Sequence, residues 1–179
     1  MMSVSDVLEI ADLLGVAGVR FWIDGGWGVD VLLRRQSREH DDLDLVIDID
    51  QTQSAKAALS ARGFSPTEDE FPTRFVMSDA SGRKVDFHPL TFDWKGGGIQ
   101  QLQQKGSFYR YPPDGFQSSG QLYGYTLRCI SAEVQMECHL GYDPEEKDVH
   151  DMKLLHDALG VRLRGKYRKL LKDNSPQHH

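Results

Sequence analysis

Apolar and polar residues repeat along this chain with two different periods, and the helical period appears first. Between Val4 and Leu14 the apolar residues recur at spacings of three and four, which predicts an amphipathic helix facing a core. Residues 20–23 favour a short strand, which Asp24-Gly25-Gly26 ends in a turn. Residues 27–34 favour a helix. The predicted order is therefore helix, strand, glycine turn and helix.

A period of two marks the strands that follow. Over residues 43–49 the apolar side chains fall on one face, whereas Asp42 and Asp44 fall on the other. Residues 74–77 and 84–88 favour two further strands joined by a turn. The sequence thus predicts neighbouring strands, one of which has an acidic face.

Helices are predicted between these strands and toward the C-terminus. Residues 52–62 have a helical pattern, and residues 131–140 form a second helix with the first of them as N-cap. A third helix follows, with Asp143 as N-cap, proline at its first position and Gly160 at its end. Residues 161–174 are basic and can extend the helical part.

The remaining segments and the fold class follow from this order. Residues 91–120 combine glycine and proline pairs with aromatic residues and favour a long irregular stretch, while residues 122–130 favour a strand or hairpin. Interleaved strands and helices predict an α/β or α+β fold, a small mixed β-sheet flanked by helices with a C-terminal helical part. The expected boundaries are one domain over 1–174, with its core over 1–130 and helices over 131–170, and a disordered tail over 175–179.

Composition narrows the environment and the partners. Two cysteines and no apparent leader predict a reducing, cytoplasmic location, and no run of apolar residues is long enough to predict a membrane span. A net charge of −6 argues against a broad nucleic-acid surface, because phosphate backbones are bound by clustered Lys and Arg. We therefore expect neither a membrane nor a nucleic acid as partner.

The Asp24-Gly25-Gly26 turn is the first candidate site. Glycines let backbone N–H groups approach a ligand, and the helix that follows directs its positive end to the same point, which suits phosphate. The alternative is an ordinary glycine turn between a strand and a helix.

The second candidate is the acidic strand face. Asp42 and Asp44 have the spacing that places both carboxylates on one side, where they can bind magnesium together with phosphate oxygens. Asp41 has the opposite parity and is the weaker candidate ligand. The alternative is a solvated acidic edge.

A third carboxylate lies on the next predicted strand. Asp86 stands between two apolar residues and is a candidate general base or metal ligand, with a turn-capping aspartate as the alternative. His88 shares its face, and we favour a structural hydrogen bond for it.

Basic residues near these carboxylates are candidates for phosphate binding. Arg38 and His40 precede the acidic strand and can donate to phosphate oxygens, or else pair with surface acids. On the last clear helix, Lys147 forms one polar patch with Asp148 and Asp151, for which an exposed ion-pair face is the favoured interpretation of the aspartates.

The combination of these elements resembles the DNA polymerase β-like nucleotidyltransferase superfamily, and the longer strings resemble its small lincosamide nucleotidyltransferases over about residues 5–158. Those strings are Trp22-Ile23-Asp24-Gly25-Gly26-Trp27-Gly28-Val29-Asp30-Val31-Leu32, Arg38-Glu39-His40, Asp86-Phe87-His88-Pro89, Cys129-Ile130-Ser131 and His139-Leu140-Gly141-Tyr142-Asp143. Aminoglycoside 2''-nucleotidyltransferases share the glycine turn and the acidic strand, and are the alternative.

The resemblance implies a reaction and a set of roles. A nucleoside monophosphate, AMP by resemblance, is transferred from a nucleoside triphosphate to a hydroxyl of a lincosamide antibiotic, with two Mg²⁺ ions as cofactors. The implied roles are metal binding for Asp42, Asp44 and Asp86, proton acceptance for Asp86, and nucleotide binding for Gly25, Gly26, Arg38, His40 and Lys147.

Other functions of the same fold stay open at this point. A protein-modifying nucleotidyltransferase would act on a partner chain, and a nucleotide-binding antitoxin or regulator would lack turnover, although all three carboxylates are present here. The sequence gives neither the preferred base nor the oligomeric state, so a homodimer stays open.

Overall fold

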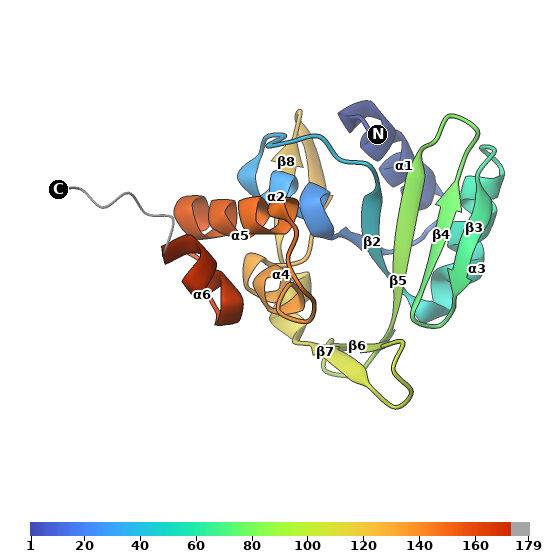
Figure 1. Ribbon diagram of the computed structural model, residues 1–179. Coiled ribbons are helices and arrows are strands. Elements are labelled where there is room, and N and C mark those ends of the chain that lie inside the picture. The colour runs from blue at the N-terminus through green and yellow to red at the C-terminus, as the bar shows by residue number, and fades with distance from the viewer. Residues whose placement is uncertain (173–179) are drawn as a thin grey trace.

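The computed structural model describes residues 1–172, which form a mixed β-sheet, a separate β-hairpin and six α-helices (Figure 1). In chain order the elements are α1 (Val4–Val16), β1 (Phe21–Ile23), α2 (Gly25–Leu33), β2 (Leu43–Asp48), η1 (Ile49–Gln51), α3 (Thr52–Ser60), β3 (Ser65–Glu70), β4 (Arg74–Ser78), β5 (Lys84–Phe92), β6 (Gly98–Gln101), β7 (Phe108–Tyr111), η2 (Pro113–Phe116), β8 (Ser119–Leu122), β9 (Tyr125–Arg128), α4 (Ala132–Cys138), α5 (Glu146–Leu159) and α6 (Gly165–Lys172). The predicted mixed sheet with a C-terminal helical part is confirmed.

The sheet has one parallel pair at its centre. Its order is β1-β2-β5-β4-β3, and β2 and β5 run parallel, whereas the other neighbours in this row are antiparallel. The far end of β5 pairs with β6, and β6 pairs with β7, so the sheet continues into a hairpin below the main strands (Figure 1). The parallel pair decides the site, because residues of β2 and β5 lie side by side in register.

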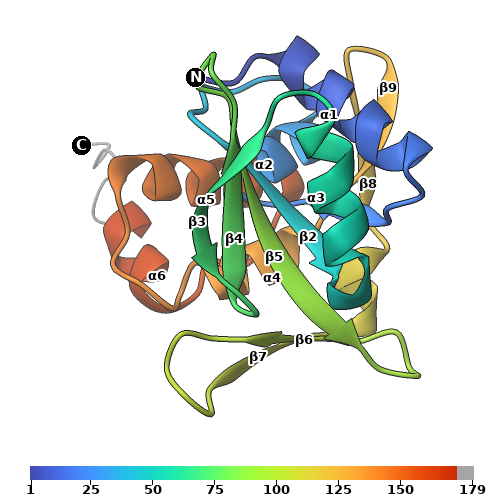
Figure 2. The ribbon, with the colours of Figure 1, turned by 90° about the vertical axis from the view of Figure 1, so that its right-hand side faces the viewer.

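Alternation along β2 separates a core face from a polar face. Leu43, Leu45 and Ile47 are buried against α1, α3 and the β8–β9 hairpin in the largest apolar cluster. Figure 2 shows α1 and α3 beside each other next to the sheet. Asp44 belongs to the other face and is only partly buried. The period of two therefore directs the carboxylate away from this core.

The C-terminal helices pack on α2, and α4 also contacts the sheet through Val134, which clusters with Trp22, Val46 and Leu90. A second apolar cluster joins Val29 of α2 to residues of α4, α5 and α6, including Met136, Met152 and Tyr167. These helices gather at one side of the molecule in Figure 1. This packing carries α5 to the side of the Gly25–Gly26 turn. None of the helices within residues 1–172 is long and apolar enough to cross a membrane.

The prediction of a long irregular stretch over 91–120 was wrong. This stretch contains β6, β7 and η2, each of four residues, together with the end of β5 and the start of the four-residue β8. Strands this short show too little alternation to be recognised. Gly98 starts β6, and a Cβ there would lie within 3.0 Å of both Leu90 and Phe116, so the glycine marks close packing rather than a loop.

Two other elements differ from the prediction. β3 was missed because all six of its residues are exposed, as befits a charged strand at a sheet edge. The helix predicted after Asp143 starts later, because the backbone N–H of Glu145 donates to Asp148 at 2.8 Å and makes Glu145 the N-cap. The predicted tail over 175–179 lies outside the described residues.

Candidate active site

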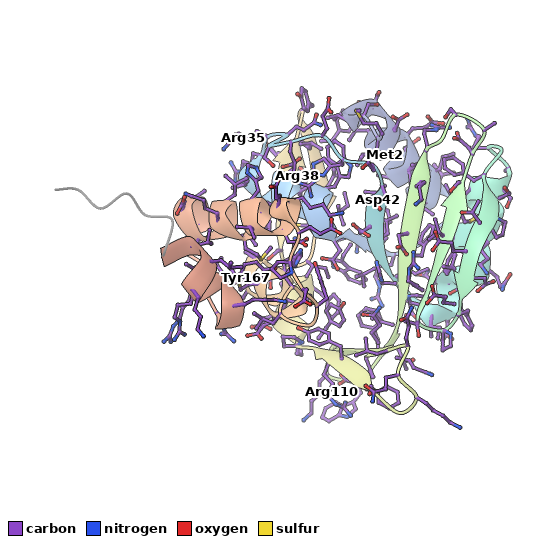
Figure 3. The ribbon with its side chains drawn as sticks, in the orientation of Figure 1. Met2, Arg35, Arg38, Asp42, Arg110 and Tyr167 are labelled. Atoms are coloured by element: carbon purple, nitrogen blue, oxygen red, sulfur yellow. The ribbon has the colours of Figure 1, made fainter. Side chains whose placement is uncertain are left out.

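A cavity of about 760 Å³ opens between the polar face of the sheet and the helices α4 and α5. Its lining includes most of the residues singled out from the sequence. They are Asp24, Gly25, Gly26, Arg38, His40, Asp41, Asp42, Asp44, Lys84, His88, Gln100, Leu102, Tyr109, Tyr111, Glu137, Cys138, His139, Gly141, Tyr142, Lys147, Asp148 and Asp151. Figure 3 shows Arg38 beside α5 and Asp42 at the start of β2.

The parallel register of β2 and β5 brings two predicted carboxylates together. Asp44 lies directly opposite Asp86, and His88 follows two residues later on the same face. Ligand atoms of Asp44, Asp86 and His88 all lie within 4.8 Å of one another, which is close enough to share one metal ion. Asp42 lines the cavity immediately before β2. The oxygen-rich donor set suits magnesium.

Burial makes most of these carboxylates costly to ionise. It raises the pKa of Asp24, although the charge of His88 works in the opposite direction. It also raises the pKa of Asp42, with the charge of Asp44 as the next cause, and the pKa of Asp86. The pKa of Asp44 is lowered, because the hydrogen bond and charge of His88 outweigh its burial. A cation bound here would stabilise the charged forms of these carboxylates.

His88 is part of the carboxylate cluster. Its Nε2 lies 3.5 Å from Asp44 Oδ1 and 3.9 Å from Asp86 Oδ1. Burial alone would lower the pKa of His88, but the hydrogen bond to Asp44 and the carboxylate charges raise the pKa to about 9. The amide nitrogen of Gln100 lies 3.3 Å from Nδ1 on the other side of the ring. The structural hydrogen bonds expected for His88 are thus made to residues of the cavity.

Arg74 of β4 holds Asp86 from the opposite side. Its Nη2 and Nε donate to Asp86 Oδ2 at 2.8 and 3.1 Å, whereas Nε lies 3.3 Å from Oδ1. Asp86 is not among the described residues that line the cavity. Oδ2 is therefore engaged by the arginine, and Oδ1 is the oxygen turned toward His88 and the more loosely held of the two.

The Gly25–Gly26 turn is glycine because other side chains occupy the neighbouring space. Gly25 has a φ of +56°, and a Cβ there would overlap the carboxylate of Asp44. A Cβ at Gly26 would overlap both Arg38 and His40. The turn therefore lets an acidic and two basic side chains converge on the start of α2.

Arg38 is fixed by a residue far along the chain. Its Nε and Nη2 donate to the two carboxylate oxygens of Asp151 at 2.9 and 2.7 Å. The prediction of an exposed ion-pair face was wrong for the aspartates of α5: Asp151 is 1% exposed and Asp148 is 6% exposed. Lys147 does extend from the exposed side of the helix, next to Glu145, and reaches the cavity wall.

The far wall of the cavity is aromatic. Tyr109 and Tyr111 come from β7, Tyr142 follows α4, and Leu102 follows β6. Burial raises the pKa of Tyr109 and of Tyr111, so both hydroxyls stay protonated. This wall offers apolar faces and hydroxyl donors to a bound molecule.

The predicted site residues are thus brought together around one cavity, with Asp86 just behind its surface. Sequence reasoning included Asp24 in the candidate glycine turn without giving its side chain a role, and it gave no site role to Tyr109 and Tyr111 or to the buried aspartates of α2 and α5. A signal existed for Asp30, which stands between Val29 and Val31 in an apolar helix and is fully buried. A charged residue in such a position requires a partner.

Comparison with known proteins decides the family. A family model described as aminoglycoside-2''-adenylyltransferase matches residues 6–155. The chain belongs to this family. It is therefore a nucleotidyltransferase, as the resemblance of its sequence motifs implied, and its fold is that of the nucleotidyltransferases. A lincosamide resistance protein of Staphylococcus haemolyticus is 35% identical over 150 residues, which cover 84% of this chain and 92% of that protein.

Solved structures agree with this placement. The crystal structure of the lincosamide antibiotic adenylyltransferase LnuA with lincomycin bound has a TM-score of 0.78 and 33% identity, and the match covers 87% of this chain and 98% of LnuA. ANT(2'')-Ia in complex with adenylyl-2''-tobramycin has a TM-score of 0.71 at 20% identity, over 87% of this chain and 88% of that protein, which shows the shared fold.

Proposed function

We propose that this nucleotidyltransferase transfers AMP from ATP to a hydroxyl of a lincosamide antibiotic, with release of pyrophosphate. The observation that carries this proposal is the alignment of Asp44 beside Asp86 and against the Gly25–Gly26 turn, at the wall of one cavity large enough for a nucleotide and an acceptor. The lincosamide adenylyltransferase LnuA supports the choice of nucleotide and acceptor, and the similar lincosamide resistance protein supports the acceptor.

The carboxylates suit a magnesium site. Asp42 and Asp44 would hold the metal through their oxygen atoms, which leaves Asp86 to accept a proton. Burial and the charge of Asp44 disfavour the charged form of Asp42 without a cation, whereas His88 already stabilises the charged form of Asp44. When bound, Mg²⁺ neutralises the charge of the phosphates and of the leaving pyrophosphate. His88 lies within reach of the same cluster and would orient Asp44 through its Nε2.

The remaining roles belong to side chains of this protein. The acceptor oxygen attacks the α-phosphorus in line, the new O–P bond forms, and the bond to the β-phosphate oxygen breaks. Asp86 takes the proton of the attacking hydroxyl, through Oδ1, because burial raises the pKa of this carboxyl and Oδ1 is the less engaged oxygen. Arg38, His40 and Lys147 line the same cavity and would bind the phosphates.

The aromatic wall is the proposed acceptor side. Tyr109, Tyr111 and Tyr142 offer flat apolar surface with hydroxyl groups, which suits a sugar joined to a lipophilic amide. An aminoglycoside is a more strongly cationic acceptor and is the second candidate. The aminoglycoside nucleotidyltransferase of Klebsiella pneumoniae matches only 38% of this chain, which favours the lincosamide.

Mass spectrometry of the products tests the proposal. The protein is incubated with each of the four nucleoside triphosphates, Mg²⁺ and a panel of lincosamides and aminoglycosides. We expect a lincosamide that has gained the mass of AMP, with pyrophosphate released in equal amount. If only aminoglycosides gain a nucleoside monophosphate, the acceptor class is an aminoglycoside and not a lincosamide. If the protein binds a nucleoside triphosphate but modifies no antibiotic in the panel, the result argues for a protein acceptor.

A further inference from the structure

Two buried aspartates lie behind the basic residues of the cavity. Asp151 of α5 is 1% exposed and holds Arg38 through two hydrogen bonds, across 113 residues of sequence. Asp30 of α2 is fully buried and pairs with His40 Nε2 at 2.6 Å. Each aspartate thus contacts one basic side chain, and neither was assigned a role from the sequence.

The geometry leaves one side of each basic group directed toward the turn. Asp151 occupies Nε and one N–H of Nη2 of Arg38, while Nη1 donates to the backbone carbonyl of Glu39. The second N–H of Nη2 has no partner among these contacts. A Cβ added at Gly26 would overlap this same Nη2, so the free N–H faces the turn.

His40 is held in a comparable way. A carboxylate only accepts hydrogen bonds, so the ring donates from Nε2 to Asp30. Asp30 is itself fixed, because Ser37 donates to its other oxygen from both the backbone N–H and the hydroxyl. Trp27 packs on the imidazole with ring centroids 4.4 Å apart. The ring cannot turn, and its Nδ1 is left on the side of Gly26.

We propose that Asp30 and Asp151 are positioning residues for the triphosphate: they hold His40 and Arg38 in the orientation that receives the β- and γ-phosphates above the Gly25–Gly26 turn. The inference rests on the proposed function only in assuming that the ligand is a nucleoside triphosphate. Buried carboxylates that orient a binding group act through geometry, as the outer ligands of metal sites do.

This arrangement has a consequence that a structural role would not share. Arg38 and His40 meet at the turn, and the helix start that binds phosphate lies there too. Loss of either aspartate should therefore weaken the binding of ATP while leaving the binding of AMP almost unchanged. A variant that simply loosens the fold weakens both nucleotides together.

Equilibrium binding of a non-hydrolysable ATP analogue and of AMP, in Mg²⁺ and without any antibiotic, tests the proposal. For Asp151→Asn and for Asp30→Asn we expect the Kd of the ATP analogue to rise by about tenfold or more, the effect of losing a hydrogen bond to a charged group. The Kd of AMP should stay within about twofold of wild type. In an Arg38→Ala background, Asp151→Asn should add no further loss.

The matched control is Asp157→Asn, which removes an exposed aspartate of the same helix that pairs with Lys153. Thermal unfolding of each variant monitors the fold. Because an unpaired, half-buried arginine can destabilise the fold, Arg38→Lys is the second variant. It keeps a cation against Asp151 but loses the two-pronged hydrogen bonding of the guanidinium, and it should lose preference for ATP over AMP while remaining folded.

The outcomes separate the two proposals. Folded aspartate variants with wild-type preference for ATP over AMP, or with equal losses for both nucleotides, would overturn the positioning role. A wild-type protein that binds the ATP analogue but modifies no lincosamide would overturn the proposed acceptor alone. A wild-type protein that binds no nucleoside triphosphate would overturn both.

Discussion

The aspartate in the turn between β4 and β5 and three aspartates of the candidate active site have pKa values that are shifted in opposite directions. In the turn between β4 and β5, Asp79 accepts hydrogen bonds from Ser81 and Arg83, through their backbone N–H groups and side chains, at 2.7 to 3.0 Å. These bonds outweigh burial and lower the pKa of Asp79 to about 2. In the cavity, burial prevails and raises the pKa of Asp24, Asp42 and Asp86.

The difference separates a residue that stabilises the fold from residues that we propose bind a ligand. Asp79 has its hydrogen bonds satisfied within the chain, so its charge contributes to folding stability. Burial and the charge of the nearby Asp44 disfavour the charged forms of Asp24, Asp42 and Asp86, so these charges oppose folding in the absence of a cation. The two sets should therefore respond oppositely to substitution, to pH and to metal.

The largest expected effect is that of Asp44→Asn on turnover. The amide keeps the shape of the side chain but loses the charge that binds metal, so we expect kcat to fall by on the order of a hundredfold to a thousandfold. Initial-rate measurements of pyrophosphate release, with circular dichroism as a check of the fold, would show this. Asp50→Asn, which alters an exposed aspartate just after the same strand, should keep wild-type rates.

Asp79→Asn should show the opposite pattern. Its loss of charge-assisted hydrogen bonds should lower the free energy of unfolding by about 2 kcal/mol at pH 7, with kcat unchanged. Because the folded pKa lies below the unfolded one, this difference from wild type should be complete above pH 4 and vanish as pH falls through about 2. Urea unfolding of both proteins across that range measures it; a pH-independent difference would contradict the account.

Magnesium should stabilise the wild-type protein. At a concentration tenfold above its Kd the ion should raise the free energy of unfolding by about 1.4 kcal/mol, which corresponds to a few degrees in Tm. Differential scanning calorimetry with and without EDTA would detect the shift. The shift should persist in Asp79→Asn and disappear in Asp44→Asn; an equal shift in all three proteins would place the ion elsewhere.

The smallest expected effect is the change in the free energy of unfolding of Asp42→Asn, and it tests the contrast between the two sets of aspartates most directly. Asp42→Asn removes a charge whose ionisation is opposed by burial and by the neighbouring Asp44, so the metal-free variant should be as stable as wild type or more stable by about 0.5 kcal/mol. Its turnover should nevertheless be lost. Urea unfolding in EDTA provides the measurement, and a clear loss of stability would show that Asp42 has structural partners.

Much of this molecule could be predicted because its periodic segments are long enough to be read. The alternation through β2 placed Asp44 on a polar face, and the pattern of the first helix identified α1 to within two residues of its end. Four-residue strands such as β6 and β7 could not be found, because their partners lie outside the segment and no local period distinguishes them.

The residue types of the site could be predicted from the sequence, but many of the contacts between their side chains could not. Carboxylate spacing and the glycine pair identified residues that the structure brings together at the cavity. The contact of Arg38 with Asp151 could not be predicted, because it depends on how α5 packs against α2. Asp86 was assigned as a base from its position between apolar residues, whereas its fork with Arg74 depends on the pairing of β4 with β5.

The cavity is lined by residues from Asp24 to Asp151, which has a consequence for synthesis on the ribosome. A nascent chain that has produced the glycine turn and all three carboxylates still lacks the helix against which Arg38 is held. The sheet can assemble first, but the cavity acquires its full lining only once α5 has emerged and docked. Activity is therefore expected only near the end of synthesis. A product truncated before α5 could form the sheet but would lack the complete active site.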